Sequence, residues 1–338
     1  MLRVAIITNS LTGGGAERAM NTLARELSKS SDFRVALIPI NFGPMDLINP
    51  QCEIYPVNRT WRGSFLNTLL AFFRFQIILF KFKPKVVLLN CDLPEFFYSL
   101  TVSRARVFVI DHSTKSWKNH PTLGKLVWSL LRWRTAAVVR VSNRIPTRRP
   151  RPKHEQTILN PLPQEIWLLK NSEIKSPEFR LVFVGRISEE KDPLMFCEIA
   201  SLTDTAAVMI GDGRLKSSLQ VRFPHFLWIG QVTNPWSLIS NRDLVLMTSL
   251  FEGDGLVLLE ALANNLPVLV RDTKDFRSFG LPEINYFTTV DEAINKVEKF
   301  RNGAISLFLQ PDFTNSILKA RDPETLATQW STVIFRNS

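Results

Sequence analysis

The sequence has few cysteines, and their arrangement excludes a disulfide framework. Cys52, Cys91 and Cys197 are isolated in the chain, odd in number and never spaced as C-x-x-C. Disulfide-dependent domains carry paired cysteines at close spacing, so this cysteine usage fits a reducing cytosol.

The sequence also has no uninterrupted apolar run of about 18 residues, the minimum for a membrane-spanning helix. Residues 65–82 come nearest, but two basic residues and two amide residues interrupt them. The apolar run at residues 2–8 leads into glycines and not into a signal-peptide cleavage site. We therefore expect any membrane contact to be peripheral.

What the chain has in excess is positive charge. Its 42 Lys and Arg residues outnumber its 31 Asp and Glu residues, for a net charge of +11. This excess favours an anionic partner, and nucleic acid, an anionic bilayer and phosphorylated small molecules all qualify. The length of 338 residues suits two domains.

Short apolar runs alternate with amphipathic segments, which is typical of β-α-β units and parallel sheets. The predicted strands are residues 4–8, 35–40, 86–90, 107–110, 137–141, 181–184, 208–210, 226–229, 244–247 and 268–270. The predicted helices are residues 16–28, 65–82, 94–102, 123–132, 193–201, 213–222, 256–264, 289–302 and 323–336.

These elements predict an α/β protein with two doubly wound, Rossmann-like domains that face each other across a cleft. The N-terminal domain covers residues 1–165 and the C-terminal domain covers residues 178–318. A C-terminal helix within residues 319–338 is expected to pack back on the first domain. The proline-rich, basic segment 146–154 should be irregular, and the hinge should lie between about residues 161 and 179.

One loop and the helix after it hold two carboxylates, Glu252 and Glu260, eight residues apart. Gly253 and Gly255 let the loop direct backbone N–H groups at a diphosphate, where a helix N-terminus favours negative charge. The second carboxylate, up to two turns into the helix, can accept hydrogen bonds from sugar hydroxyls. This arrangement predicts a nucleotide-sugar site.

Two further strands are followed by loops that suit phosphate or sugar. The adjacent glycines at residues 13–15 open a helix without forming a G-x-G-x-x-G or a Walker A motif, and the alternative is a flexible turn. Arg186 and Lys191 could both reach one diphosphate, the first through forked hydrogen bonds and the second as a mobile point charge. The alternative for these two residues is a solvated loop with i,i+4 ion pairs.

Two weaker candidates are polar residues near predicted strand ends. His112 follows strand 107–110 and could contact a sugar hydroxyl, although a lone histidine is more often structural. Asn160 precedes the second half of the chain and could lie at the floor of the cleft.

Together these motifs resemble the retaining glycosyltransferases of family 4, which adopt the two-domain GT-B fold. The resemblance rests on the glycine loop 13–18, on Arg186 with Lys191, and on the E-x7-E motif from Glu252 to Glu260, which is the most specific. It implies transfer of a hexose or N-acetylhexosamine from a UDP- or GDP-sugar with retention of anomeric configuration. It also implies no metal and no other cofactor, and the sequence contains no Asp-x-Asp pair.

The resemblance also implies a role for each matching residue. Glu260 would bind the ribose hydroxyls, Glu252 and His112 would face the transferred sugar, and Arg186 and Lys191 would grip the diphosphate. The catalytic candidates are therefore Glu252, His112, Arg186 and Lys191. The donor-binding candidates are Gly14, Gly15, Asn160, Gly253, Gly255, Leu256, Val257 and Glu260. The implied reaction is a front-face attack in which the diphosphate helps to deprotonate the acceptor, with no covalent nucleophile.

The sequence departs from the family pattern at three places near the motif. Asp254 stands between the glycines where the family often has an aromatic residue, and Asn265 replaces a small residue. Residues 271–276 lack the common acidic-then-glycine segment. These departures leave the identity of the sugar open.

Basic and aromatic residues lie side by side in two segments, which suits an anionic membrane surface. Residues 132–153 hold eight Lys or Arg residues and no acidic residue, and residues 65–82 are rich in phenylalanine. With the family likeness, this favours a peripheral enzyme on the cytoplasmic face, acting on a polyprenyl-diphosphate-linked or other lipid-linked glycan for bacterial surface polysaccharide or lipopolysaccharide. The alternative for residues 65–82 is a buried packing helix.

Three other functions remain open at this point. The chain could transfer sugar to a soluble acceptor, or be an inactive scaffold-like relative. It could also be a basic nucleic-acid-binding protein, but it lacks a recognised binding module, and Glu252 and Glu260 would then have no role.

Overall fold

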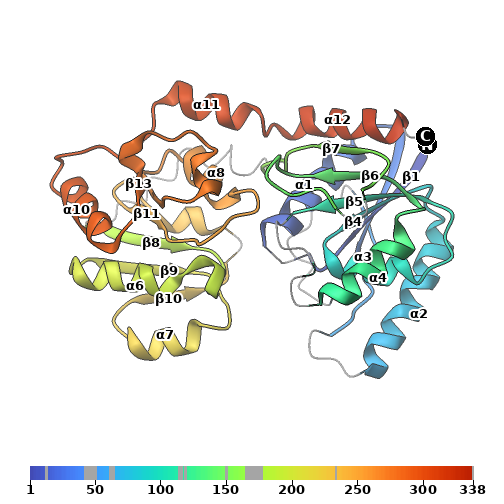
Figure 1. Cartoon of the computed structure of the whole chain (residues 1–338), viewed down its shortest axis with the longest axis horizontal. Coiled ribbons are helices and arrows are strands. Elements are labelled where there is room, and N and C mark those ends of the chain that lie inside the picture. Colours follow the sequence, from blue (N-terminus) through green and yellow to red (C-terminus); the bar gives the residue numbers. More distant parts are fainter. Residues whose placement is uncertain are drawn as a thin grey trace. The chain divides into compact units, whose positions relative to one another are not determined.

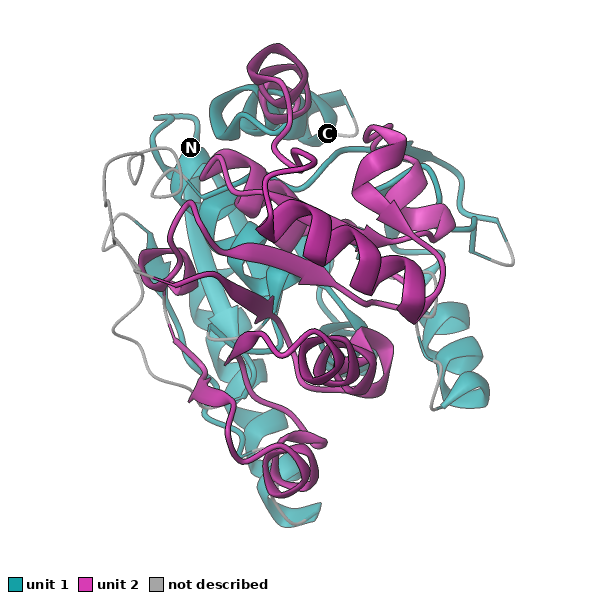
Figure 2. Ribbon diagram, turned by 90° about the vertical axis from the view of Figure 1, so that its left-hand side faces the viewer, with its two compact units in different colours: residues 1–163, 321–338 teal, residues 164–320 magenta. Residues whose placement is uncertain are grey.

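The computed structural model describes residues 1–11, 14–41, 52–60, 65–112, 117, 120–148, 151–163, 178–232 and 234–336. The chain divides into two compact units, which Figures 1 and 2 show. Unit 1 comprises residues 1–163 and 321–338, and unit 2 comprises residues 164–320.

Unit 1 is built on a parallel sheet whose described strands follow the order β3-β2-β1-β4-β5-β6-β7. Its central strands are continuous apolar runs because helices cover both faces of the sheet. The strands are β1 (Leu2–Thr8), β2 (Phe33–Pro39), β3 (Glu53–Ile54), β4 (Val86–Asn90), β5 (Arg106–Asp111), β6 (Thr135–Arg140) and β7 (Glu155–Thr157).

The helices of unit 1 form two layers, one on each face of this sheet (Figure 1). Successive strand side chains point to opposite faces, so Ile6 belongs to one core and Ile7 to the other. The first core is covered by α1 (Gly15–Ser28) and α12 (Pro323–Arg336). The second is covered by α2 (Phe65–Phe82), α3 (Asp92–Ser99) and α4 (Pro121–Leu131).

Unit 2 repeats this design with a parallel sheet in the order β10-β9-β8-β11-β12-β13 among its described strands. These strands are β8 (Arg180–Val184), β9 (Ala206–Ile210), β10 (Leu227–Gly230), β11 (Leu244–Met247), β12 (Val268–Arg271) and β13 (Tyr286–Phe287). The helices are α6 (Pro193–Leu202), α7 (Lys216–Arg222), α8 (Leu256–Ala263), α9 (Lys274–Arg277), α10 (Val290–Arg301) and α11 (Pro311–Lys319). The described part of unit 2 also contains three short 3-10 helices: η1 (Glu189–Lys191), η2 (Pro235–Leu238) and η3 (Glu283–Asn285).

The predicted α/β architecture is confirmed, since both sheets are parallel and both are flanked by helices. The helix expected from residue 213 begins only at Lys216, because the glycine-containing segment before it forms a turn. The described residues of segment 146–154 contain no helix or strand. Most of the predicted hinge, residues 164–177, lies outside the described residues.

The C-terminal helix α12 belongs to unit 1 because its apolar face packs against α1 and the sheet. Trp330 is 1% exposed in this core, with Leu326 and Ile334 on the same face at helical spacing. The chain therefore returns to its first unit after completing its second.

We predict that Trp330→Ala lowers the free energy of unfolding by about 3–5 kcal/mol, because it removes a large buried side chain and leaves a cavity. Gln329→Ala on the exposed side of the same helix should change it by no more than about 0.5 kcal/mol. Urea denaturation followed by circular dichroism measures both. Equal effects would contradict the packing of α12 on unit 1.

Candidate functional site

The strand order of unit 2 reverses between β8 and β11, and ligands of doubly wound sheets bind beyond the carboxyl ends of the strands at such a point. Lys191 lies in η1 after β8, and Glu252 follows β11. The Lys191 Nζ contacts Glu252 Oε1 at 2.6 Å, and Ser249 Oγ donates to the same oxygen at 2.8 Å. The structure thus brings together two predicted site residues that are 61 positions apart.

Hydrogen bonds below this ion pair fix the two loops to each other. Thr248 Oγ1 donates to the carbonyl oxygens of Lys191 and Asp192 at 2.9 and 2.8 Å. Arg271 Nη1 donates to Asp192 Oδ2 at 2.8 Å, and to the carbonyl of Thr248 at 3.3 Å. The backbone that carries Lys191 is therefore held from β11 and from β12.

The glycine-containing loop turns directly from Glu252 into the first turn of α8. Gly255 caps the helix with φ +67°, and an added Cβ would lie 2.7 Å from the Phe279 ring, so this position requires glycine. The backbone N–H groups of Gly255, Leu256 and Val257 precede the helical hydrogen-bond ladder and have no intrahelical acceptor. They form a positive helix end beside the Lys191–Glu252 pair.

Glu260 lies within α8 and is buried at 2% exposure. Its Oε2 accepts a hydrogen bond from Trp236 Nε1 at 2.9 Å, and Trp236 belongs to η2 after β10. The carboxylate that sequence analysis assigns to ribose is therefore oriented by an indole from a different loop.

Arg186 differs from Lys191 in being solvent-exposed, with 63% of its side chain accessible. It follows Gly185 and pairs with Glu190 at 3.3 Å in an i,i+4 contact, as the solvated-loop alternative predicted. An exposed pair of this kind contributes little to stability, so the guanidinium can exchange Glu190 for another anion.

Four of the predicted site residues lie in unit 1. Gly14 caps α1 and Gly15 opens it, while Thr12 and Gly13 lie outside the described residues. His112 follows β5 directly, and its Nδ1 lies 3.3 Å from Asn160 Nδ2. The Asn160 carbonyl in turn accepts from Arg321 Nη1 at 3.3 Å.

The imidazole of His112 is neutral at physiological pH. Burial lowers its pKa from 6.5 to about 3, because the charged form would lose its hydration. Its Nε2 is buried and has no hydrogen-bond partner among the described residues. If the Asn160 amide donates to Nδ1, then Nε2 carries the proton and can donate to a hydroxyl oxygen.

This arrangement lies in a part of the chain that is similar to a known protein family. Residues 167–295 match the family described as glycosyl transferases group 1. Unit 2 carries a group 1 glycosyltransferase domain. The Lys191–Glu252 pair, the α8 N-terminus and Glu260 all lie within the matched residues.

Two curated relatives are similar to the chain at low identity. An Escherichia coli UDP-Gal:alpha-D-GlcNAc-diphosphoundecaprenol alpha-1,3-galactosyltransferase is 25% identical over 146 residues, which cover 39% of this chain and 37% of that protein. A Campylobacter jejuni N-acetylgalactosamine-N,N'-diacetylbacillosaminyl-diphospho-undecaprenol 4-alpha-N-acetylgalactosaminyltransferase is 25% identical over 325 residues, which cover 86% of this chain and 87% of that protein.

Among solved structures, Anabaena HepE in complex with UDP-glucose superposes with a TM-score of 0.78 at 14% identity, over 99% of this chain and all of that chain. The fold is therefore GT-B, with two Rossmann-like domains, as the family resemblance implied. The group 1 match covers only part of the chain, and it supports a glycosyltransferase.

Three arginines of the basic segment 132–153 make polar contacts within unit 1. Arg134 donates to the carbonyls of Thr101 and Ser103, and Arg140 pairs with Glu155 at 3.2 Å. Arg148 lies between the buried carboxylates of Glu95 and Asp111, with 11% of its side chain exposed. These three arginines are paired inside unit 1, and the contact of this segment with an anionic membrane surface stays a prediction.

The contacts of Trp236 and Arg148 could not be predicted, because neither residue lies in a recognisable sequence motif. The Asn234-Pro235 pair before Trp236 signals a turn, and Asn234 does cap η2. No local pattern shows that the indole reaches Glu260 on another element.

The buried imidazole should make stability depend on pH. Its folded-state pKa lies below the unfolded value, so only the unfolded chain binds a proton at His112 between pH 6.5 and about 3. The free energy of unfolding should therefore be fully retained above pH 6.5 and fall as the pH drops below it, by up to about 1.4 kcal/mol per pH unit.

We predict that His112→Gln has a shallower loss of stability than the wild type in this window, measured by urea denaturation between neutral pH and about pH 5. Identical pH dependence in the two proteins would contradict a buried, neutral His112.

Proposed function

We propose that the chain transfers a hexosyl or N-acetylhexosaminyl group from a UDP- or GDP-sugar to a polyprenyl-diphosphate-linked glycan, with retention of configuration and without a metal. The observation that carries this proposal is the Lys191–Glu252 pair at the strand-order reversal of unit 2, next to the N-terminus of α8. The group 1 match of the same residues supports it.

The donor diphosphate would be bound by the cationic side of this site. An ammonium has three N–H donors, and Lys191 directs one to Glu252, so the others can reach phosphate oxygens. Arg186 can exchange its exposed partner for the same diphosphate, and the first amides of α8 add the positive end of a helix. These groups stabilise the charge that develops on the leaving diphosphate, which is the task a metal performs in other transferases.

The two carboxylates would bind the two sugars of the donor. Both described contacts of the Glu252 side chain use Oε1, which leaves Oε2 for a hydroxyl of the transferred sugar. The Glu260 carboxylate, oriented by Trp236, would accept from the ribose hydroxyls. Such bonds to ionised acceptors are stronger than neutral ones.

In the proposed reaction the acceptor hydroxyl attacks the anomeric carbon on the face from which the diphosphate departs. The bond between the anomeric carbon and the diphosphate oxygen breaks, the new glycosidic bond forms, and the acceptor proton passes to a diphosphate oxygen. The products are the extended glycan and a nucleoside diphosphate. Lys191 and Arg186 assist by stabilising the departing anion.

We predict that Lys191→Ala and Glu260→Ala each reduce sugar transfer by about 100-fold or more while the protein stays folded, because each removes a charged contact to the donor. Lys299→Ala on the exposed side of α10 is the matched control and should keep wild-type turnover. Transfer of radiolabelled sugar from a panel of UDP- and GDP-sugars measures this. Near-wild-type turnover in either site variant would refute the assignment.

The proposed acceptor is lipid-linked because both relatives above are named for diphospho-undecaprenol acceptors. A lipid-linked acceptor requires the enzyme to work at a membrane surface. We therefore propose a peripheral attachment to the inner face of the cytoplasmic membrane, in a surface-polysaccharide pathway.

Helix α2 supplies the surface for this attachment. Phe75, Leu79 and Phe82 pack in the core of unit 1, but the opposite side of the helix presents a row of large apolar side chains to solvent. The exposed members are Phe65, Leu66, Leu69, Leu70, Phe73, Ile77 and Phe80. An exposed apolar face of this size marks an interaction surface, which contradicts the alternative of a buried packing helix.

Charge and packing indicate whether α2 would span a bilayer or lie in its interface. Exposed Arg74, Lys81, Lys83 and Lys85 flank the apolar face, which suits anionic headgroups. By length and composition alone α2 is the one described helix that could span a membrane, with a mean hydropathy of 1.5. Spanning would remove Phe75 from the core, so we propose that α2 lies in the interface plane.

We predict that the triple variant Phe73→Ser/Ile77→Ser/Phe80→Ser weakens binding to anionic phosphatidylglycerol vesicles by at least about 100-fold, since three large side chains contribute several kcal/mol. Val221→Ser, which changes an 83%-exposed residue of unit 2, is the control and should bind as the wild type does. Vesicle co-sedimentation measures this. Undiminished binding of the triple variant, or no binding of the wild type, would refute the attachment through α2.

A further inference from the structure

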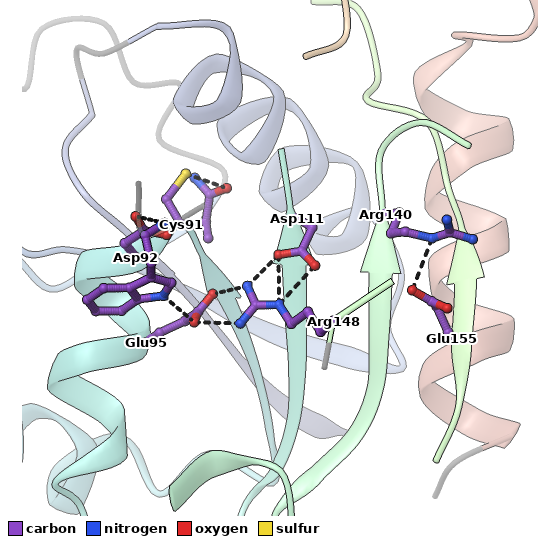
Figure 3. Close-up of polar contacts among 9 residues, drawn as sticks. Cys91, Asp92, Glu95, Asp111, Arg140, Arg148 and Glu155 are labelled. Carbon is purple, nitrogen blue, oxygen red and sulfur yellow. Dashed lines mark hydrogen bonds and ion pairs between the residues drawn. The ribbon is translucent and has the colours of Figure 1, made fainter. Parts of the chain in front are cut away.

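Arg148 joins two buried carboxylates of unit 1 that no proposed step of the reaction uses (Figure 3). Its Nη1 and Nη2 donate to Glu95 Oε2 and Oε1 at 2.8 and 2.5 Å. Its Nε donates to Asp111 Oδ1 and Oδ2 at 3.0 and 2.9 Å, and Nη2 makes a further contact with Oδ1. The side chains of Glu95, Asp111 and Arg148 are 0%, 3% and 11% exposed.

The network connects three segments that are distant in the sequence. Glu95 lies in α3, Asp111 is the last residue of β5, and Arg148 belongs to the segment after β6. Trp117 Nε1 donates to Glu95 Oε2 at 3.1 Å, and the Trp128 ring of α4 lies 5.3 Å from the guanidinium carbon. Arg148 is thus held in a single orientation, and its planar fork matches both carboxylates at once.

Stability alone does not account for this arrangement. Two carboxylates and one guanidinium leave one net negative charge inside the unit, and burial raises the pKa of the Glu95 carboxyl despite the guanidinium beside it. Apolar side chains of similar volume at such positions are often equally or more stabilising. The network therefore provides a defined geometry more than it provides stability.

The residue whose geometry it defines is His112, the next residue after Asp111. Arg148 holds the side chain of Asp111, and the Asp111 carbonyl accepts from Val141 N at 3.1 Å, so the end of β5 is fixed twice. Because a single peptide bond joins Asp111 to His112, a shift of Asp111 also shifts His112. On the other side, Asn160 contacts the imidazole.

We propose that Arg148 is a positioning residue: by holding Asp111 it fixes the His112 imidazole for its contact with the transferred sugar. This inference rests on the proposed function, together with the sugar-facing role that the family resemblance implies for His112. We assign Arg148 itself no contact with the donor or the acceptor.

Kinetics of conservative variants test this inference. Arg148→Lys keeps the charge but cannot bridge two carboxylates as a fork does, and Asp111→Asn keeps the shape and leaves the Arg148–Glu95 pair in place. Both should lower kcat by about 10-fold or more and leave the donor KM within about 2-fold, because a small misplacement acts on the reacting geometry. Arg140→Lys, at the neighbouring Arg140–Glu155 pair, is the matched control and should keep wild-type kcat.

A double-mutant cycle separates positioning from general destabilisation. If Arg148 acts through His112, Arg148→Lys/His112→Ala should lose no more activity than His112→Ala alone. Losses that multiply in the double variant would overturn the proposal. So would a donor KM that rises together with the fall in kcat, or Arg140→Lys losing as much activity as Arg148→Lys.

An NMR measurement that does not depend on enzyme activity keeps this test independent of the proposed function. The chain has 4 histidines, so the imidazole ¹⁵N signals of His112 can be assigned by their loss in His112→Gln. These signals should shift in Arg148→Lys and Asp111→Asn and stay in place in Arg140→Lys. Unmoved signals would overturn the positioning role, whereas moved signals in a protein that transfers no sugar would refute only the proposed function.

Discussion

The ion pair between Lys191 and Glu252 connects the two loops on either side of the strand-order reversal in unit 2. At this point of a parallel doubly wound sheet the connections after two neighbouring strands leave toward opposite faces, which opens a crevice at their carboxyl ends. The side chains of Lys191 and Glu252 are 19% and 11% exposed, respectively. A ligand can therefore still reach the pair. Thr248, Asp192 and Arg271 then fix the backbone below it.

The rest of the donor site depends on that junction. Glu252 stands at the start of the loop whose Gly255 turns the chain into α8, so the ion pair also places the positive helix end. Glu260 follows on the same short helix, and Trp236 orients its carboxylate from η2. Unit 1 reverses its strand order between β1 and β4, where Asn90 Nδ2 donates to Thr8 Oγ1 at 3.0 Å. One architectural rule therefore positions polar residues in both units.

Much of this could be predicted from the sequence because the signals are local. Buried central strands such as β4 and β11 are continuous apolar runs, and the glycines and carboxylates of the Glu252–Glu260 motif lie close together in the chain. The short edge strands β3 and β7 were not predicted, since two or three residues carry no periodic pattern. Their existence depends on a neighbouring strand.

Contacts between distant residues could not be predicted for the same reason. Lys191 and Glu252 were both proposed as ligands, but nothing in the sequence indicates that they pair across 61 positions. Arg148 stands in a run of basic residues that is typical of solvated charge, and only the fold shows that it pairs with the buried carboxylates of Glu95 and Asp111. The exposed face of α2 is also a tertiary result, because the helix pattern alone fits a buried element equally well.

The most direct test of the donor site is hydrogen–deuterium exchange of the full chain with and without saturating UDP or GDP. We expect the nucleoside diphosphate that binds to slow exchange at the amides of residues 185–191 and 252–260, because its phosphates accept hydrogen bonds there. Binding confirmed by calorimetry without protection of these two segments, or with protection only in unit 1, would contradict the account.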